Sequence, residues 1–291
     1  MIVDRRAGAL HLIRKSLRLL SVLFLWDLVI VLFFNLAHQD WMDQPALPFS
    51  LIGAALALFL NIRNTVAYNR WWEARILWGA ITNNARSFAR QTASLLGGNP
   101  ELTRAMAAYA YALCGSLSGT DRREDLCRLL PPLMAARIQG RRNQPTAILH
   151  EIGIETLRLA QERTVDPAAY AGIDRTLSEF SNAQGGLERI RNTPLAIQFS
   201  VLPGLLAHGF CIVLPLSMVQ DLGWITPLGS TIVGFLFLAL DENGRDLEDP
   251  FKTTLHALPM NAMATTIEID LLQPLGDPVP PPVQAINGIL P

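Results

Sequence analysis

The stretch that decides the fold is LPFSLIGAALALFL at residues 47–60, followed by NIRNTVAYNRWWE at residues 61–73. The first part carries no charge, and the second has neither proline nor glycine, which next occurs at Gly79. Because no helix breaker interrupts the polar part, we predict one helix that leaves a bilayer and continues into water. Fourteen residues fall short of the roughly 20 that span a bilayer alone. We therefore expect protein neighbours to shield part of this helix.

The composition is typical of a membrane protein. Half of the 291 residues are hydrophobic and 17% are charged. A net charge near −1 provides no basic face for a nucleic acid. The cysteines Cys114, Cys127 and Cys211 are too far apart for a paired zinc or disulfide framework, so we interpret them as buried thiols.

Four segments have the hydropathy of membrane helices. Two of them, at residues 19–37 and 47–60, lie near the N-terminus, and the other two, at 197–219 and 224–240, follow a long polar stretch. That stretch has helical periodicity and no useful run of alternating residues. The sequence therefore predicts an all-α, polytopic membrane protein with a helical region outside the bilayer.

Flanking charge predicts how the chain is oriented. The loop at residues 38–48 holds Asp40 and Asp43 but no lysine or arginine. Basic residues lie on the other side of both segments, at Arg5, Arg6, Arg14, Lys15, Arg18, Arg63, Arg70 and Arg75. By the positive-inside rule, the loop faces outward and both termini are cytoplasmic. We expect a multi-pass protein of the cell (inner) membrane, in contact with lipid.

The same patterns divide the chain into four parts. Residues 1–97 contain the first two membrane helices and a cytoplasmic extension of the second, and 98–192 form the cytoplasmic helical region. Residues 193–250 contain the third and fourth membrane helices. Residues 251–291 form a C-terminal cytoplasmic segment with a proline-rich tail.

No motif in the sequence supports catalysis. His150 and Glu151 begin like a metalloprotease helix, but the second histidine is missing at the required spacing. Phosphate-binding loops, dinucleotide fingerprints and nucleophile elbows are also absent from the sequence. We therefore predict that the protein is not an enzyme and needs neither a cofactor nor a metal.

Asp27 is the ionisable residue in the first membrane segment. A charge at mid-bilayer costs about 2.5–3.5 kcal/mol on insertion scales, so such residues usually face the bundle interior. One interpretation is a contact in an ion path or gate. The other, which we favour, is a pair with an arginine or a protonated carboxyl that is hydrogen-bonded inside the bundle.

Ala54, Leu58 and Ile62 are spaced four residues apart and so share one stripe of the second helix. Ordinary helix packing explains such a stripe. If several copies surround an axis, the same stripe forms rings of apolar side chains. Rings of this kind stop ions by dewetting, because they do not replace an ion's hydration shell. Spacing alone leaves both interpretations open.

Several blocks of sequence resemble the bestrophin family, in its prokaryotic branch. IRNTVAYNRWWEAR at 62–75, continued by LWGA at 77–80, is similar to the family signature. ERIRNTP at 188–194, GWITPL at 223–228 and LEDPF at 247–251 are similar to further blocks in the same order. The resemblance covers nearly the whole chain.

The resemblance implies a homopentameric ion channel around one central pore, with four membrane-associated helices per subunit. In the family, three apolar residues from the second helix line a narrow neck, and they match Ala54, Leu58 and Ile62 here. The family usually has a bulkier residue at the first position, so we expect a wider ring at Ala54. A second constriction lies at the cytoplasmic exit, and Ile173 is the matching candidate.

The signature block Arg70, Trp71, Trp72 and Glu73 is expected to pack at the membrane–cytoplasm boundary and to couple neighbouring subunits. Animal bestrophins bind calcium through an acidic cluster after an Asn-Pro-Phe block. Here KTTLH at 252–256 stands in that place, and calcium sites need several oxygen ligands. We therefore expect no calcium clasp and interpret the acidic residues of 241–249 as a solvated helix end.

The conducted ion is expected to be monovalent. Acidic residues at Asp40, Asp43 and Asp174 favour a cation such as sodium, because acidic rings attract cations. Chloride or another anion, as in animal bestrophins, is the alternative. A secondary transporter would show repeated, broken helices, and a membrane-anchored scaffold would use 98–192 for docking without any flux.

Overall fold

The structure is a computed structural model that describes residues 5–37, 46–252, 254, 256–285 and 290. Every regular element in those ranges is a helix, which confirms the predicted all-α class. The helices are α1 (Arg5–Ala37), α2 (Ala46–Leu95), α3 (Pro100–Ser118), α4 (Arg123–Leu129), α5 (Pro132–Ile138), α6 (Gln144–Glu162), α7 (Pro167–Asn192), α8 (Ile197–Ser200), α9 (Leu202–Leu222), η2 (Gly223–Ile225), α10 (Thr226–Glu248), α11 (Met260–Leu272) and η3 (Gln273–Leu275).

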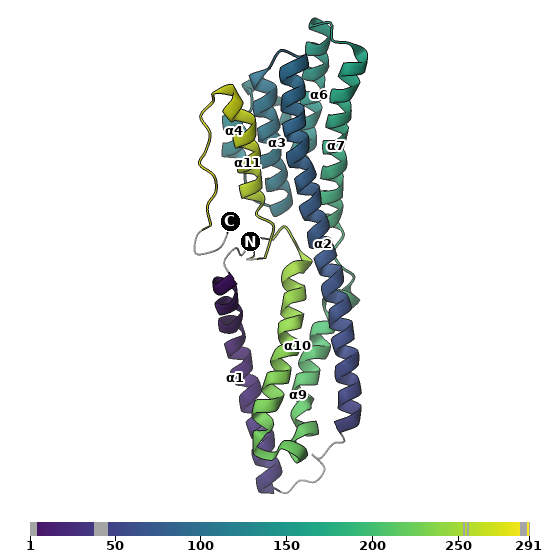
Figure 1. Cartoon of the computed structure of the whole chain (residues 1–291), viewed down its shortest axis with the longest axis vertical. Coiled ribbons are helices and arrows are strands. Elements are labelled where there is room, and N and C mark those ends of the chain that lie inside the picture. Colours follow the sequence, from purple (N-terminus) through teal and green to yellow (C-terminus); the bar gives the residue numbers. More distant parts are fainter. Residues whose placement is uncertain (1–4, 38–45, 253, 255, 286–289, 291) are drawn as a thin grey trace. The chain divides into compact units, whose positions relative to one another are not determined.

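The chain forms two compact units. The apolar unit comprises residues 2–71 and 194–249, and the polar unit comprises residues 72–193 and 250–291. These divisions differ from the predicted parts, because residues 72–97 and much of the C-terminal segment pack with 98–193. The second helix contributes to both units, as its continuous path in Figure 1 shows.

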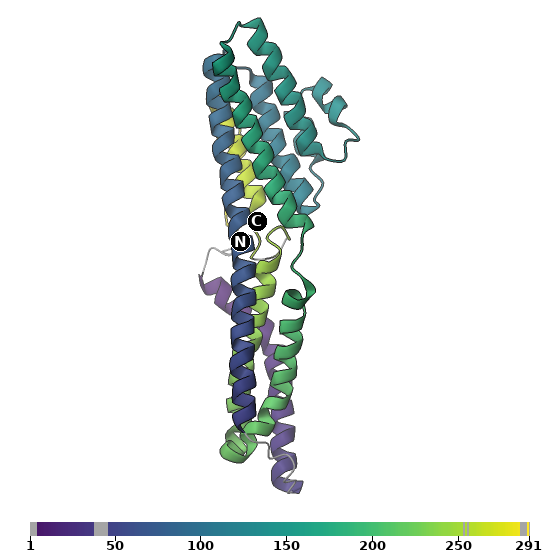
Figure 2. The same cartoon turned by 90° about the vertical axis from the view of Figure 1, so that its right-hand side faces the viewer.

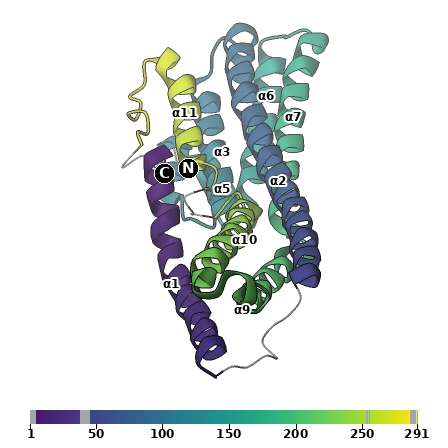
Figure 3. The ribbon, with the colours of Figure 1, turned by 60° about the horizontal axis from the view of Figure 1, so that its bottom comes forward.

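The apolar unit is a helical bundle in which α10 packs against both α1 and α9 (Figure 3). Glycines allow its helices to approach closely. A Cβ atom at Gly53 would lie 3.1 Å from Cζ of Phe210, and one at Gly234 would lie 3.3 Å from Cδ1 of Leu23. The core comprises Leu23, Leu56, Leu60, Ala207, Phe210, Cys211, Leu214 and Leu238. Close packing over small residues is how helices associate in lipid.

Two helical stretches, Pro48–Leu95 and Ile197–Glu248, are long and apolar enough to cross a membrane, and a shorter apolar stretch covers Leu20–Leu36. The second stretch contains α9 and α10, which η2 joins at the predicted turn near Gly223. The length and composition of these stretches agree with the membrane segments predicted from the sequence. The four-span topology itself stays a prediction.

The polar unit is built around α3, which contacts α4, α6, α7 and α11 (Figure 2). Alanine side chains allow this close approach, at Ala105, Ala107, Ala108, Ala110 and Ala112. Tyr109 of α3 packs edge-on against Phe180 of α7, with 5.4 Å between ring centroids. The region at residues 98–192, which the sequence predicts to be helical and outside the bilayer, therefore has a buried core of its own.

A buried carboxylate fixes α11 within the polar unit. Glu268 is fully buried and accepts hydrogen bonds from Tyr111 Oη at 2.7 Å and Arg128 Nη2 at 3.1 Å. Burial, with the adjacent Glu268 charge, raises the pKa of the Tyr111 phenol. One acidic side chain thus joins α3, α4 and α11.

Candidate functional site

The membrane part of α2 has one buried and one exposed face. Leu56 and Leu60 pack inside the apolar unit, with exposed fractions of 5% and 0%. Ala54, Leu58 and Ile62 lie on the other face, where Leu58 is 62% exposed and Ile62 is 44% exposed. The predicted stripe therefore projects from the subunit and is free to contact lipid, another copy of the chain, or a water-filled path.

The exposed face of this helix is uncharged from residue 51 to 69. Arg63 is the charged residue in that range, and it is fully buried. Thr65 and Asn69 continue the exposed face beyond the apolar stripe. An apolar band followed by neutral polar groups would repel water at the band without attracting either sign of ion.

Arg63 faces the bundle interior and pairs with Asp241 of α10. Its Nη1 donates to Asp241 Oδ1 at 2.6 Å and to Asp241 O at 3.0 Å. Arg245 Nη2 lies 3.0 Å from Asp241 Oδ2, and Glu248 Oε2 lies 3.7 Å from Arg63 Nη2. Each charge in this group thus has a neighbour of opposite sign, as buried charges require.

The prediction of a solvated helix end at 241–249 is wrong for Asp241. That residue is only 2% exposed because Arg63 reaches it from α2. Asn64 Nδ2 also donates to Leu240 O at 2.9 Å, so α2 and α10 touch along a polar seam. A Cβ at Gly244 would lie 3.3 Å from Cζ of Arg63, so a small residue is needed there. The seam fixes the rotation of α2, and Ile62 therefore points outward.

Asp27 is buried in the bundle, with an exposed fraction of 1%. Its Oδ2 accepts hydrogen bonds from Ser230 Oγ and, at 3.1 Å, from Thr231 Oγ1. Among the described residues, no arginine or lysine forms an ion pair with it. The geometry fits a carboxyl group that is hydrogen-bonded between α1 and α10, which is one of the arrangements favoured from the sequence.

The signature block takes part in contacts on both sides of Trp71. Trp71 stacks on Tyr68, with ring centroids 6.4 Å apart. Within the polar unit, Glu73 forms an ion pair with Arg189 of α7. Arg70 is half-buried, and Trp72 remains 48% exposed. The role of this block between subunits stays a prediction.

Ile173 does not fit its expected place at a cytoplasmic opening. Its side chain is fully buried in the polar unit, on the same face of α7 as Leu177 and Phe180. A residue in a helix core cannot line an opening at the surface. Its neighbour Asp174 is exposed, whereas Asp40 and Asp43 lie outside the described residues.

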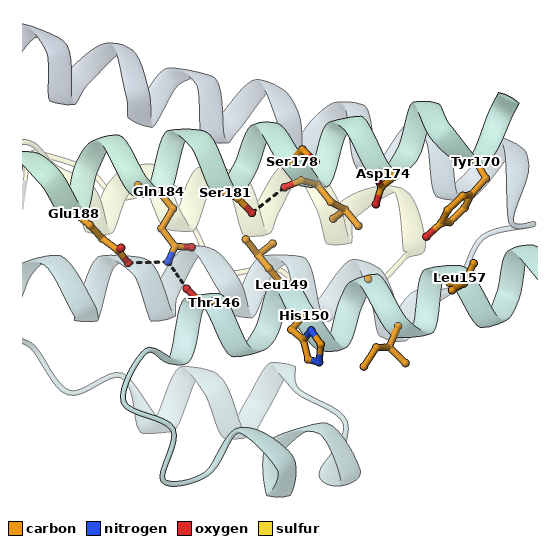
Figure 4. Close-up of a pocket in the computed structure, with 14 residues that line it drawn as sticks. Thr146, Leu149, His150, Leu157, Tyr170, Asp174, Ser178, Ser181, Gln184 and Glu188 are labelled. Atoms are coloured by element: carbon orange, nitrogen blue, oxygen red, sulfur yellow. Dashed lines mark hydrogen bonds between the residues drawn. The ribbon is translucent and has the colours of Figure 1, made fainter. Parts of the chain in front are cut away.

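A groove between α6 and α7 was missed from the sequence (Figure 4). Its volume is about 560 Å³, and its polar lining includes Asp174, Gln184 and Glu188. Burial and the Asp174 charge raise the pKa of Tyr170 at one end. The polar spacing along α7 was the available signal, but only the pairing with α6 creates the groove. No cluster of metal-binding side chains occurs among the described residues.

Comparisons with known proteins match most of the chain. The sequence profile described as bacterial and fungal bestrophin protein matches residues 12–273. A voltage-dependent anion channel-forming protein of Ralstonia nicotianae is 36% identical over 251 residues, covering 83% of this chain and 82% of that protein. A protein of the same description from Mesorhizobium japonicum is 33% identical, covering 80% and 76%. A crystal structure of a bacterial bestrophin homologue from Klebsiella pneumoniae superposes with a TM-score of 0.86 at 31% identity, covering 90% of this chain and all of that one.

Proposed function

The chain belongs to the bacterial and fungal bestrophin family, and on this premise we propose that it forms a homopentameric channel that passes monovalent ions passively. The names of its relatives support an ion channel. A solved relative, covered over its whole length, supports the same helical fold for this chain. No catalytic step and no cofactor are part of this proposal.

The observation that carries the proposal is the outward face of α2. Three apolar side chains, Ala54, Leu58 and Ile62, project from a stretch of α2, residues 51–69, whose one charged residue is the buried Arg63. Around a symmetry axis, each position becomes a ring. Leu58 and Ile62 form the tighter rings, and Ala54 forms a wider one because its side chain is a single methyl group. Narrow apolar rings stop ions because water leaves the ring and nothing in it replaces the hydration shell of the ion.

In the membrane, α1, α2, α9 and α10 serve as the four spans, and both termini are cytoplasmic. The first halves of α2 surround the axis, and the signature block couples neighbouring subunits near the cytoplasmic boundary. Trp71→Ala tests the coupling. If the Trp71→Ala protein assembles and conducts like the unaltered protein, the signature block does not couple neighbouring subunits.

A cation such as sodium is the first candidate for the conducted ion. The exposed carboxylate of Asp174 supports it, because acidic rings favour cations. An anion is the second candidate, and the names of the relatives, which describe anion channel-forming proteins, favour it. The uncharged stripe of α2 is compatible with either sign, so selectivity must come from charges elsewhere.

Reconstitution into liposomes with sodium and chloride gradients tests the function. A channel gives a current that reverses at a potential set by the permeant ion, and the sign of that potential separates cation from anion. Flux that saturates and needs a coupled gradient would indicate a transporter instead. A protein without flux would be a scaffold, and the proposal would fail.

A further inference from the structure

The groove between α6 and α7 shares Asp174 with the argument for a cation, but none of its other lining residues takes part in the proposed pore. Its volume of about 560 Å³ lies in the range of small-molecule sites. Neither lysine nor arginine is among the residues that line it, whereas two carboxylates are. The groove therefore has acidic character in a chain whose net charge is close to zero.

Its carboxylates, Asp174 and Glu188, lie toward opposite ends of the groove (Figure 4). They are separated by fourteen residues of one helix, and a rise of 1.5 Å per residue places them about 21 Å apart along α7. Neither makes an ion pair within the part of the chain that the structure describes. The nearby Glu155, by contrast, is paired with Arg158.

The Glu188 end also contains a buried acceptor without a donor. Gln184 is 3% exposed, and its Nε2 donates to Thr146 Oγ1 and Glu188 Oε1, both at 2.8 Å. These two bonds fix the orientation of the amide. Its Oε1 then has no hydrogen-bond partner among the described residues. Buried polar atoms are rarely left in this state, so a ligand that brings donors to this end of the groove would improve its hydrogen bonding.

Between the two ends, the groove has a mixed lining. Ser178 and Ser181 of α7 supply hydroxyl groups, and Leu157 and Ile154 of α6 supply an apolar wall. Leu157 is 42% exposed and Ile154 is 47% exposed, although both lie in a polar unit. An aliphatic chain along the groove would cover these two side chains and remove their apolar surface from water.

We propose that the α6–α7 groove binds a linear aliphatic polyamine, with one ammonium at Asp174 and another between Glu188 and Gln184. An ammonium has three donors and no acceptor, which matches a lining rich in acceptors. Hydrogen bonds to ionised carboxylates are among the stronger ones in proteins. The methylene chain accounts for the apolar wall, and a single small cation would fill only one end. This binding goes beyond the proposed channel function and does not require ion flux.

Calorimetric titration of the purified full-length protein with spermine tests the proposal directly. A series of α,ω-diamines from diaminobutane to diaminododecane then varies only the distance between the charges. At about 150 mM salt, where exposed charges are screened beyond roughly 8 Å, affinity should rise with length as the second ammonium reaches its carboxylate. Asp174→Asn and Glu188→Gln should each weaken spermine binding about tenfold.

Asp121→Asn is the matched control, because it removes an exposed carboxylate outside the groove and should leave binding unchanged. The Asp174→Asn/Glu188→Gln variant should lose the dependence on diamine length. Absence of spermine binding by the unaltered protein would overturn the proposal. So would equal binding by the double variant, or a diamine series without length dependence. Each result is read from binding alone, so it is independent of whether the protein conducts.

Discussion

Replacing Asp241 by asparagine removes the charge that faces the buried Arg63 and keeps the size of the side chain. Arg63 Nη1 lies 2.6 Å from Asp241 Oδ1, and Arg63 is fully buried. An arginine does not lose its proton in a protein, so the guanidinium stays charged. Glu248, 3.7 Å from Arg63 Nη2, would be its remaining carboxylate among the described residues.

The cost follows from this geometry. Removing one partner of a buried ion pair costs about 3–5 kcal/mol, because the other charge is left uncompensated. Glu248 keeps part of the compensation, so we expect the lower end, about 3 kcal/mol. A loss of 1 kcal/mol lowers the melting temperature of a large domain by about 2 °C or more, which gives a decrease of about 6 °C. Arg63→Met with Asp241→Leu removes both buried charges and leaves only Arg245 and Glu248, whose side chains are 47% and 24% exposed, so it should recover part of this loss.

Thermal unfolding of the purified protein in one detergent, followed by tryptophan fluorescence at fixed protein concentration, measures the difference. Asp121→Asn is the control, since its side chain is 68% exposed and pairs with an exposed arginine. Its melting temperature should not change. If Asp241→Asn melts within about 1 °C of the unaltered protein, the pair does not hold α2 against α10. A double variant that is less stable than the single one would also contradict the reasoning.

Leu58→Ala and Ile62→Ala should each raise ion leak into liposomes, because smaller apolar rings hydrate more easily; unchanged flux in both would place the gate elsewhere. Tyr109→Phe should stabilise the protein by about 1 kcal/mol at pH 7, since it removes a buried hydroxyl without a partner among the described residues. Burial raises the pKa of Tyr109, so above about pH 10 the unfolded chain ionises first and stability falls with pH. The variant should show a shallower fall in a denaturant titration. Glu268→Gln weakens charge-assisted hydrogen bonds and should cost about 1.5–3 kcal/mol in the same measurement; a neutral result would show that α11 is held by apolar packing.

Periodicity was sufficient to predict the all-α class and to place Ala54, Leu58 and Ile62 on one stripe of α2, whereas the structure was needed to show that this stripe is exposed. Leu58 and Ile62 fall on one face, and Leu56 and Leu60 fall on the other, because helical spacing alone separates them. The break between apolar and polar sequence likewise predicted a helix that continues past residue 73. These features are local, and local spacing determines them.

The errors concern features that depend on distant contacts. Asp241 looked solvated because its partner, Arg63, lies 178 residues away in the sequence. The groove required the pairing of α6 with α7, which periodicity does not specify. Ile173 is a different case, since its spacing from Leu177 and Phe180 is that of a buried helix face. That signal was present in the sequence and was outweighed by the family alignment.

Accessibility of position 58 to a charged reagent tests the central claim most directly. In reconstituted, conducting protein, Leu58→Cys should react with a charged, water-soluble methanethiosulfonate and lose its current. Leu205→Cys, at an exposed apolar position of α9, should not lose current. If the cysteine at position 58 instead reacts only with a lipid-soluble maleimide and the current persists, the face of α2 that carries Leu58 lies against lipid and does not line a pore.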